Sequence, residues 1–195
     1  LNPNYSYKKN NIIFEKSDSN ILITSKNYEK NAKKIIVNKQ KLKKLLVLDS
    51  NIKVSKKFQK LSTYSYVQKK FDNVYILFTS GSTGTPKGVP INNQNLISYI
   101  SNILKKIKPT NTDRFSQIFD LTFDLSIHDL FVCWLSGACL YIMQKKDIIN
   151  PVHYINNNKL TFWFSVPSFA VYMYKMKLLK KNIFPTLKYS LFCGE

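Results

Sequence analysis

A short segment rich in glycine and hydroxyl side chains is the part of this 195-residue chain best suited to chemistry. The segment Ser80–Val89 reads SGSTGTPKGV and directly follows an apolar run, YILFT, at Tyr75–Thr79. Glycines let the backbone approach an anion closely, while backbone N–H groups, hydroxyls and a lysine ammonium all donate hydrogen bonds. This combination predicts a polyphosphate-binding loop in preference to a flexible surface loop.

The Walker A motif, G-x-x-x-x-G-K-[ST], is the main alternative among phosphate-binding loops. Pro86 stands where that motif, counted from Gly81, requires its second glycine. Lys87 is followed by Gly88 where the motif requires Ser or Thr. The segment therefore does not belong to the Walker A class.

Short apolar runs alternate with longer amphipathic runs, and these elements must position the loop. The predicted strands are Ile21–Thr24, Leu45–Leu48, Tyr75–Thr79, Arg114–Gln117, Ala138–Met143, Thr161–Val166 and Tyr189–Cys193. The predicted helices are Asn95–Ile107, Ser126–Ser136 and Pro167–Leu179. Most of the strands are continuous apolar runs, typical of strands covered on both faces, and the alternation indicates an α/β fold with a largely parallel sheet. The lysine-rich stretch 26–70 is expected to be a surface excursion.

Local signals set the expected helix ends. Ser126 and Asp129 have the spacing of a capping box, and Gly137 is a stop signal for the same helix. Pro167 suits a first helical turn. The apolar stretch Leu130–Met143 is then a buried helix followed by a buried strand.

The strong positive charge does not indicate nucleic-acid binding. Lys and Arg number 30 against 11 Asp and Glu, which gives a formal net charge of +19, but Arg114 is the only arginine. Proteins that bind nucleic acids use arginine for bidentate contacts with base edges and phosphates. We therefore expect dispersed surface lysines and no nucleic-acid partner.

The apolar runs and the cysteines exclude two further classes. The longest apolar stretch, Leu130–Met143, is shorter than the about 20 residues that a membrane-spanning helix needs. Cys133, Cys139 and Cys193 lack CxxC spacing, and the chain has only two histidines, which does not favour a zinc site. We expect packed, reduced thiols in a cytoplasmic protein without a membrane partner.

Three segments resemble motifs of the adenylate-forming superfamily, which includes acyl-CoA synthetases, luciferases and the adenylation domains of nonribosomal peptide synthetases. TSGSTGTPKG at 79–88 resembles its signature, and RFSQIFDLTFDLSIHD at 114–129 resembles its FDxS motif, with Phe123, Asp124 and Ser126 in place. LFCGE at 191–195 is similar to the family's GGE strand, with Cys193 where the first glycine is usual. The first residues, LNPNYSYKKNNIIFEKSDSNILIT at 1–24, resemble amino-acid-activating members, although Lys8 or Lys9 stands where an arginine is usual.

The resemblance implies a parallel-sheet αβα subdomain of the large N-terminal domain of an adenylate-forming enzyme. Residues 1–195 would be a partial adenylation domain, truncated at both ends and without the small C-terminal domain. Such enzymes join a carboxylate to ATP with the help of Mg²⁺, release pyrophosphate, and transfer the acyl group to the thiol of phosphopantetheine or coenzyme A. The implied partners are an amino acid or another small carboxylic acid and a carrier protein.

The matched motifs imply a role for particular residues. The phosphate-binding residues would be Thr79, Ser80, Gly81, Ser82, Thr83, Gly84 and Lys87. The adenine side would use Cys193, Gly194 and Glu195. Asp124 would pair with the α-ammonium of an amino acid, Phe123 would gate the substrate pocket, and His128 would line it. The catalytic residues and the metal ligand of the family would lie beyond Glu195.

Other interpretations are open for these residues and for the function. Asp124 could be a helix-start charge, Phe123 a core aromatic residue and His128 a half-buried polar residue on its helix. The leading function is amino-acid activation, by a peptide-synthetase module or a D-alanine–carrier-protein-ligase-like enzyme. The alternatives are an acyl- or aryl-acid CoA ligase, against which Asp124 speaks, and a non-catalytic remnant that keeps the fold.

Overall fold

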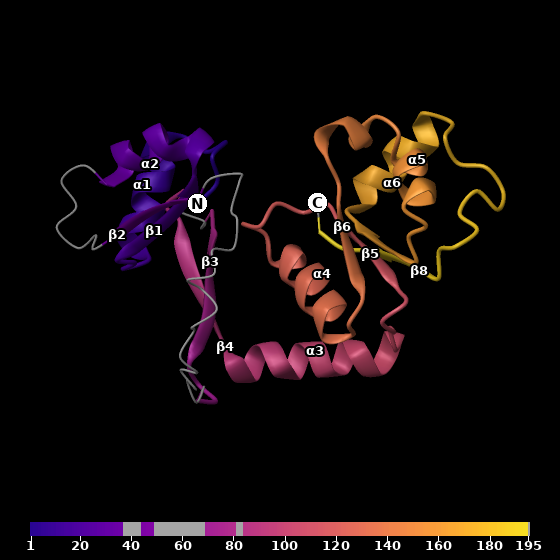
Figure 1. The fold of residues 1–195 in the computed structure, drawn as a ribbon, viewed down its shortest axis with the longest axis horizontal. Coiled ribbons are helices and arrows are strands. Elements are labelled where there is room, and N and C mark those ends of the chain that lie inside the picture. The colour runs from indigo at the N-terminus through magenta and orange to yellow at the C-terminus, as the bar shows by residue number, and fades with distance from the viewer. Residues whose placement is uncertain (37–43, 49–68, 81–83, 195) are drawn as a thin grey trace, which may run out of the picture. The chain divides into compact units, whose positions relative to one another are not determined.

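The computed structural model describes residues 1–36, 44–48, 69–80 and 84–194, drawn in colour in Figure 1. The chain divides into two compact units, Leu1–Gln94 and Asn95–Glu195, and each is described by itself.

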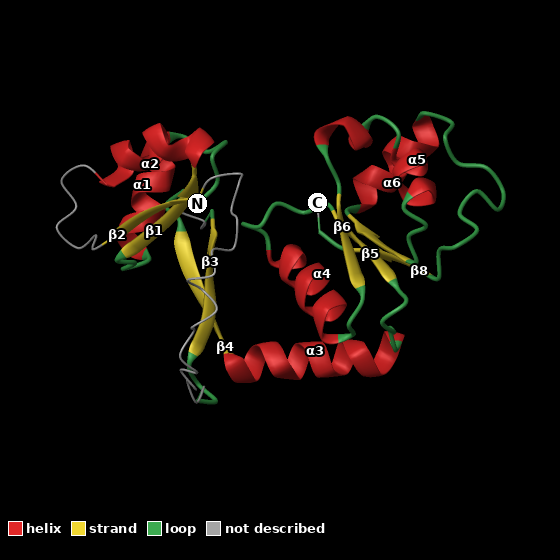
Figure 2. Cartoon of the chain, in the orientation of Figure 1, coloured by secondary structure: helices red, strands yellow, loops and turns green. Residues whose placement is uncertain are grey.

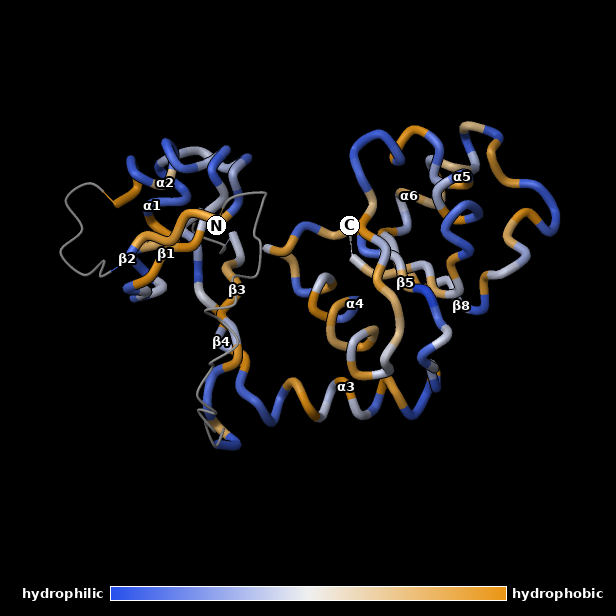
Figure 3. Tube along the Cα trace, in the orientation of Figure 1, coloured by the Kyte–Doolittle hydropathy of each residue, from blue (hydrophilic) through white to orange (hydrophobic). Residues whose placement is uncertain are grey.

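The first unit opens with two helices and a parallel pair of strands. Its elements are α1 (Tyr7–Lys16), β1 (Ile21–Ser25), the 3₁₀ helix η1 (Lys26–Tyr28), α2 (Glu29–Ile36) and β2 (Lys44–Leu48). Ser6 caps α1 by accepting a hydrogen bond from the backbone N–H of Lys9. Figure 3 shows the apolar run of β1 in orange beside these largely blue and white helices. β1 and β2 confirm two predicted strands, whereas α1 and α2 were not predicted.

The first unit ends in an antiparallel hairpin of β3 (Asn73–Thr79) and β4 (Lys87–Asn92). β3 confirms a predicted strand, but β4 was not predicted, and the antiparallel pairing departs from the expected parallel arrangement. No residue of β3 is fully buried, so the expectation of a buried strand before the loop was wrong.

The second unit contains a four-stranded parallel sheet (Figure 2). The elements are α3 (Asn93–Ile107, whose first two residues fall in the first unit), β5 (Arg114–Gln117), α4 (Asp124–Leu135), β6 (Cys139–Ile142), the 3₁₀ helix η3 (Lys145–Ile148), α5 (Pro151–Asn157), β7 (Phe162–Ser165), α6 (Pro167–Lys175) and β8 (Tyr189–Phe192). The strand order is β6-β5-β7-β8, which confirms the predicted α/β class with a parallel sheet.

Alternating side chains of β7 show that helices cover both faces of this sheet. Phe164 contacts the ring of His128 on α4, with ring centroids 4.9 Å apart. Trp163 points to the opposite face, where it packs in a core with Tyr154 and Ile155 of α5 and with Phe169 of α6. Because successive side chains of a strand point to opposite faces, the sheet lies between these helices in an αβα sandwich.

Two helix ends differ from the sequence prediction, and two agree. α4 begins at Asp124, because Phe123 is the N-cap in an extended conformation, and the hydroxyl of Ser126 donates to the carbonyl oxygen of Phe123 at 2.6 Å. The predicted capping box was therefore wrong. Gly137 has a left-handed φ of +69° just after the helix, as a stop signal requires. α6 begins at Pro167 as predicted but ends at Lys175, ahead of the predicted Leu179.

Two surface expectations can be compared with the described residues. Within them, no helix has the length and apolarity to cross a membrane. Cys133 is buried, as expected for a packed thiol, whereas Cys139 and Cys193 are exposed. The two exposed thiols correct that part of the expectation.

Candidate functional site

The hairpin of the first unit brings the two ends of the predicted phosphate loop together. Thr79, the last residue of β3, lies opposite Lys87, the first residue of β4, in the antiparallel register. Both side chains are exposed, as are Ser80 and Gly84. Gly81, Ser82 and Thr83 lie outside the described residues. The described part of the loop therefore presents a hydroxyl and an ammonium side by side at an open hairpin end.

Two glycines give this hairpin end its shape. Gly84 has a φ of +72°, a conformation that residues with a side chain rarely adopt. A Cβ atom added to Gly88 would lie 3.1 Å from Cζ of Phe78, its partner across the hairpin. The ring of Phe78 therefore needs the space over Gly88 directly behind the loop.

The second predicted set of site residues lies at one edge of the parallel sheet. The sheet has its topological switch point at β5, because β6 and β7 lie on either side of that strand. Ligands of open α/β sheets bind at the carboxyl ends of the strands, next to such a switch point. Asp124 begins the helix that follows the carboxyl end of β5, and Cys193 and Gly194 follow the carboxyl end of β8.

The structure brings these two segments into contact. A Cβ atom added to Gly194, which has a φ of +72°, would lie 3.5 Å from Cδ1 of Leu125, the neighbour of Asp124. The backbone N–H of Cys193 donates to the carbonyl oxygen of Ser165 at 3.3 Å, which ties this segment to the end of β7. Glu195 lies outside the described residues. Segments of two sequence motifs that are far apart along the chain thus meet at one edge of the sheet.

Asp124 and Phe123 are both exposed at the start of α4. The side chain of Phe123 keeps 55% of its surface accessible, so the alternative of a core aromatic residue was wrong. Asp124 is the acidic residue in the first turn of α4, where a carboxylate also interacts favourably with the helix dipole. Both the pocket role and the helix-start role of Asp124 are compatible with this position.

His128 lies one turn further along α4 in a very different environment. Only 4% of its surface is exposed, so the alternative of a half-buried residue was wrong. Its Nδ1 lies 2.9 Å from the hydroxyl oxygen of Tyr99 on α3, and its ring packs edge-on against Phe164. Burial lowers the pKa of His128 to about 4, so the imidazole is neutral at pH 7. Within the described part of the chain, its Nε2 has no hydrogen-bond partner.

Two polar residues near the site were missed or misassigned from the sequence. Tyr99 is 45% exposed on α3, and its bond to His128 has no local signal in the sequence. Asp129 was predicted to cap α4, but it is 1% exposed, and burial raises its pKa to about 9. One of its carboxyl oxygens has no hydrogen-bond partner among the described residues. The Asp129 carboxyl group is thus neutral at pH 7.

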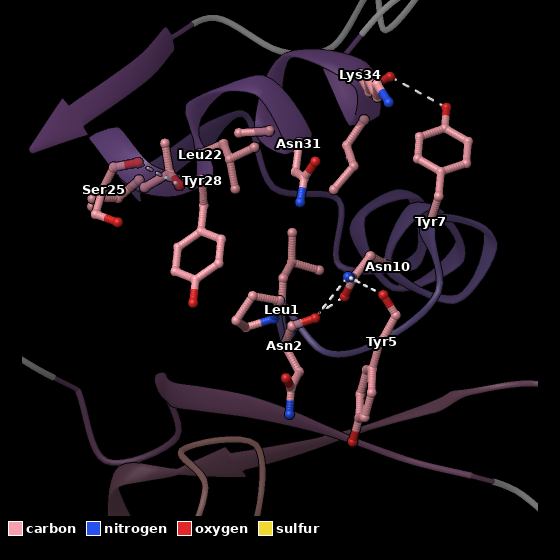
Figure 4. A pocket seen from close by; sticks show the side chains of 15 residues that line it. Leu1, Asn2, Tyr5, Tyr7, Asn10, Leu22, Ser25, Tyr28, Asn31 and Lys34 are labelled. Atoms are coloured by element: carbon pink, nitrogen blue, oxygen red, sulfur yellow. Dashed lines mark hydrogen bonds between the residues drawn. The ribbon is translucent and has the colours of Figure 1, made fainter. Parts of the chain in front are cut away.

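A cavity of about 460 Å³ lies elsewhere in the first unit. Figure 4 shows Leu1, Tyr28 and Asn31 among the side chains that surround it. Several of its lining residues, among them Leu1, Asn2 and Tyr5, come from the N-terminal segment that resembles amino-acid-activating members, whereas none belongs to the phosphate loop or to the segments 114–129 and 191–195. Among the described residues, no group of three or more His, Cys, Asp or Glu side chains is arranged to hold a metal ion.

Comparison with known proteins gives a consistent result. The family described as AMP-binding enzyme matches residues 1–195. A D-alanine–D-alanyl carrier protein ligase of Listeria welshimeri is 39% identical over 130 residues, which cover 65% of this chain and 26% of the ligase. A ligase of the same name from Listeria monocytogenes serotype 4a is 35% identical over 148 residues, which cover 73% of this chain and 28% of the ligase. This chain thus spans about a quarter of the length of these curated relatives.

Solved structures show the same fold. The adenylation domain AlmE of Vibrio cholerae, in complex with glycyl-adenosine-5'-phosphate, has a TM-score of 0.83 at 25% identity, covering 100% of this chain and 40% of that chain. ATP-bound MatB of Rhodopseudomonas palustris has a TM-score of 0.80 at 16% identity, covering 97% of this chain and 38% of that chain, and this likeness concerns the fold alone. Since the family match extends over every residue, the chain belongs to the AMP-binding enzyme family.

Proposed function

We propose that this chain provides ATP- and substrate-binding residues of an enzyme that activates an amino acid as its adenylate. The carboxylate of the amino acid attacks the α-phosphorus of ATP, an acyl–phosphate bond forms, and pyrophosphate leaves. The thiol of phosphopantetheine on a carrier protein then attacks the acyl carbon, a thioester forms, the acyl–phosphate bond breaks, and AMP leaves. The chain's relatives named D-alanine–D-alanyl carrier protein ligase support this choice over a coenzyme A ligase.

The observation that carries the proposal is the position of Asp124. It is an exposed carboxylate at the carboxyl edge of a parallel sheet, beside the Cys193–Gly194 segment. A carboxylate in a substrate pocket has a high desolvation cost unless a cation pairs with it, and an α-ammonium is such a cation. His128 is neutral and therefore does not compete for this role.

The second part of the proposed function is the binding of the triphosphate of ATP by the phosphate loop. An anionic carboxylate must approach a phosphorus surrounded by anionic oxygens, so positioning and charge stabilisation are expected to supply most of the rate. The hydroxyl of Thr79 and the ammonium of Lys87 would hold the β- and γ-phosphates, together with Ser80 and Gly84. We expect Mg²⁺ to arrive bound to the phosphate oxygens of ATP, which are the hard ligands it prefers.

The test is a pyrophosphate-exchange assay with an enzyme that contains this chain and has the full length of the related ligases. Glycine and D-alanine are offered beside acetate and propionate, which lack only the ammonium. We expect the wild type to prefer the amino acids by at least about a hundredfold, because the acids leave Asp124 unpaired. Equal exchange with both classes would favour the coenzyme A ligase.

A matched pair of variants assigns the preference to one residue. Asp124→Asn should raise the KM for the amino acid by at least about tenfold. Asp120→Asn replaces a second exposed aspartate, four residues earlier in the loop before α4, and an asparagine there can still accept the bonds from Thr122. The Asp120 variant should therefore keep its KM. A loss in both variants, or in neither, would contradict the proposed role of Asp124.

The cytoplasmic location is a prediction of the same kind. It follows from the need for ATP and from the expectation of reduced thiols. A fluorescent fusion of the intact protein, located by microscopy, tests it directly.

A further inference from the structure

The last residue of α1 contacts the downstream end of the phosphate loop. The ammonium Nζ of Lys16 donates a hydrogen bond to the carbonyl oxygen of Pro86 at 3.0 Å, although the two residues are 70 positions apart in the sequence. Pro86 immediately precedes Lys87, the loop's ammonium. The resemblance of residues 1–24 assigns no role to Lys16.

The helix that presents Lys16 is firmly held in the first unit. The side-chain Nδ2 of Asn10, in the middle of α1, donates to the carbonyl oxygens of Asn2 at 2.8 Å and Tyr5 at 3.4 Å, and these bonds are drawn in Figure 4. Ile13 and Phe14 of the same helix are buried. Because buried side chains and these bonds fix α1, its end is a stable support for whatever it contacts.

The contacted carbonyl controls the direction of a donor in the loop. A trans peptide is planar, so the C=O of Pro86 and the N–H of Lys87 point in opposite directions within one rigid unit. Pro86 has a fixed φ and is buried, whereas Gly84, Thr85 and Lys87 are exposed. A bond that holds the Pro86 oxygen therefore also sets the orientation of the peptide from which the Lys87 side chain extends.

We propose that Lys16 is a positioning residue for the phosphate loop. Through the carbonyl of Pro86 it holds the segment Gly84–Lys87 ready for the triphosphate, which lowers the ordering cost of binding ATP. Lys16 does not itself touch the nucleotide in this proposal. The inference rests on the proposed phosphate role of the loop.

The first test follows the contact without any ligand. Hydrogen–deuterium exchange is measured on the 195-residue chain for a peptide spanning 84–89, in the wild type and in Lys16→Met, which removes the donor but keeps the side-chain length. Exchange in the variant should be about threefold or more faster, because the local opening becomes easier. Lys8→Met is the matched control, since it removes an exposed lysine from the first turn of the same helix. An unchanged exchange rate in Lys16→Met would overturn the proposal.

The second test separates positioning from a general loss of stability. The assay is pyrophosphate exchange with an enzyme that contains this chain and has the full length of the related ligases. In this enzyme, Lys16→Met should raise the KM for ATP by about three- to tenfold. The kcat and the KM for the amino acid should stay within about twofold, and Lys16→Arg, which retains a charged donor, should restore the KM for ATP. A merely structural role would lower the yield of active enzyme without this selective change in KM.

Lys87→Ala distinguishes the failure of this inference from the failure of the proposed function. If Lys87→Ala raises the KM for ATP and Lys16→Met does not, Lys16 is no positioning residue, while the phosphate role of the loop stands. If neither variant changes it, the phosphate role itself is wrong, and the inference falls with it.

Discussion

Replacing Asp129 with asparagine should stabilise the protein at neutral pH. The folded protein holds this carboxyl group protonated, with a pKa raised to about 9 by burial, against a pKa of 3.8 for the free side chain. At pH 7, about three pH units above the free pKa, the Asp129 side chain ionises in the unfolded chain but not in the folded protein. This ionisation favours the unfolded state by about 4 kcal/mol. Asparagine has the same shape and no charge to lose. We expect Asp129→Asn to recover most of this free energy of unfolding at pH 7.

The dependence on pH makes the prediction specific. A raised folded pKa means that the contribution of Asp129 is present below pH 3.8 and is lost as the pH rises to about 9. His128 has the opposite sign, because its folded pKa of about 4 lies below 6.5, and its contribution is lost as the pH falls from 6.5 to 4. The two contributions cancel between pH 4 and 6.5 in the wild type. Above pH 6.5 the wild type should lose about 3 kcal/mol by pH 9.

The variant should have a different profile. Without Asp129, only the His128 contribution remains, so the stability of Asp129→Asn should rise by about 3 kcal/mol from pH 4 to pH 6.5 and then stay level. Urea denaturation followed by tryptophan fluorescence measures both profiles. Asp124→Asn is the control, because this exposed carboxylate at the start of the same helix contributes about 0.3–1 kcal/mol in the opposite direction. Equal stability of the wild type and Asp129→Asn at pH 7 would refute the reasoning.

Three further variants test packing and buried polar contacts in the two units. Gly88→Val should cost about 1–3 kcal/mol, since the added side chain meets the phenyl ring across the hairpin, and urea denaturation measures the loss. Lys188→Met should cost about 1–3 kcal/mol at pH 7, because the 2%-exposed Asp113 loses an ion pair of 2.6 Å, and the cost should shrink in acid as that carboxylate protonates. Tyr99→Phe should cost about 1–2 kcal/mol without a change in circular dichroism, because His128 loses its one described hydrogen bond. An unchanged melting temperature would contradict a stabilising role for this bond.

Three strands of the second unit, β6, β7 and β8, were predictable because they lie in largely continuous apolar runs, whereas β5, with the sequence RFSQ, is no such run. β5 was predicted with its observed bounds, and β6, β7 and β8 within two residues at each end. β4 was missed because its sequence, KGVPIN, contains a proline and a glycine and has no apolar run. Both residues are tolerated there since Gly88 makes room for a ring and, among the described residues, β4 pairs with β3 alone and is an edge strand. A prediction from local composition therefore missed β4, because its Gly88 is explained by the contact with Phe78 on the neighbouring strand.

The parts of the candidate site that lie in short sequence motifs could be predicted. The contacts between residues far apart in the sequence could not. The loop after β3 and the start of α4 follow from short motifs and from strands that end beside them. The bond from Lys16 to Pro86 and the pairing of Tyr99 with His128 join residues 70 and 29 positions apart. No pattern within either helix marks them, because both lysine and tyrosine are common at such helical positions in this chain. Only the fold reveals which of many similar side chains matters.

The two aspartates of α4 show why sequence type alone does not assign a role. Asp124 and Asp129 are five residues apart, so on a helix with 100° per residue they point about 140° away from each other. One is exposed at the carboxyl edge of the sheet, and the other is buried under the helix and protonated. A substrate ammonium needs the charged carboxylate of Asp124, whereas the core around Asp129 tolerates only a neutral carboxyl group. Asp124→Asn should therefore weaken amino-acid binding without stabilising the protein, and Asp129→Asn should stabilise the protein with binding unchanged. If Asp124→Asn stabilises the protein, or if Asp129→Asn weakens amino-acid binding, the two carboxyl groups are coupled, and the separation of site from core along this helix is wrong.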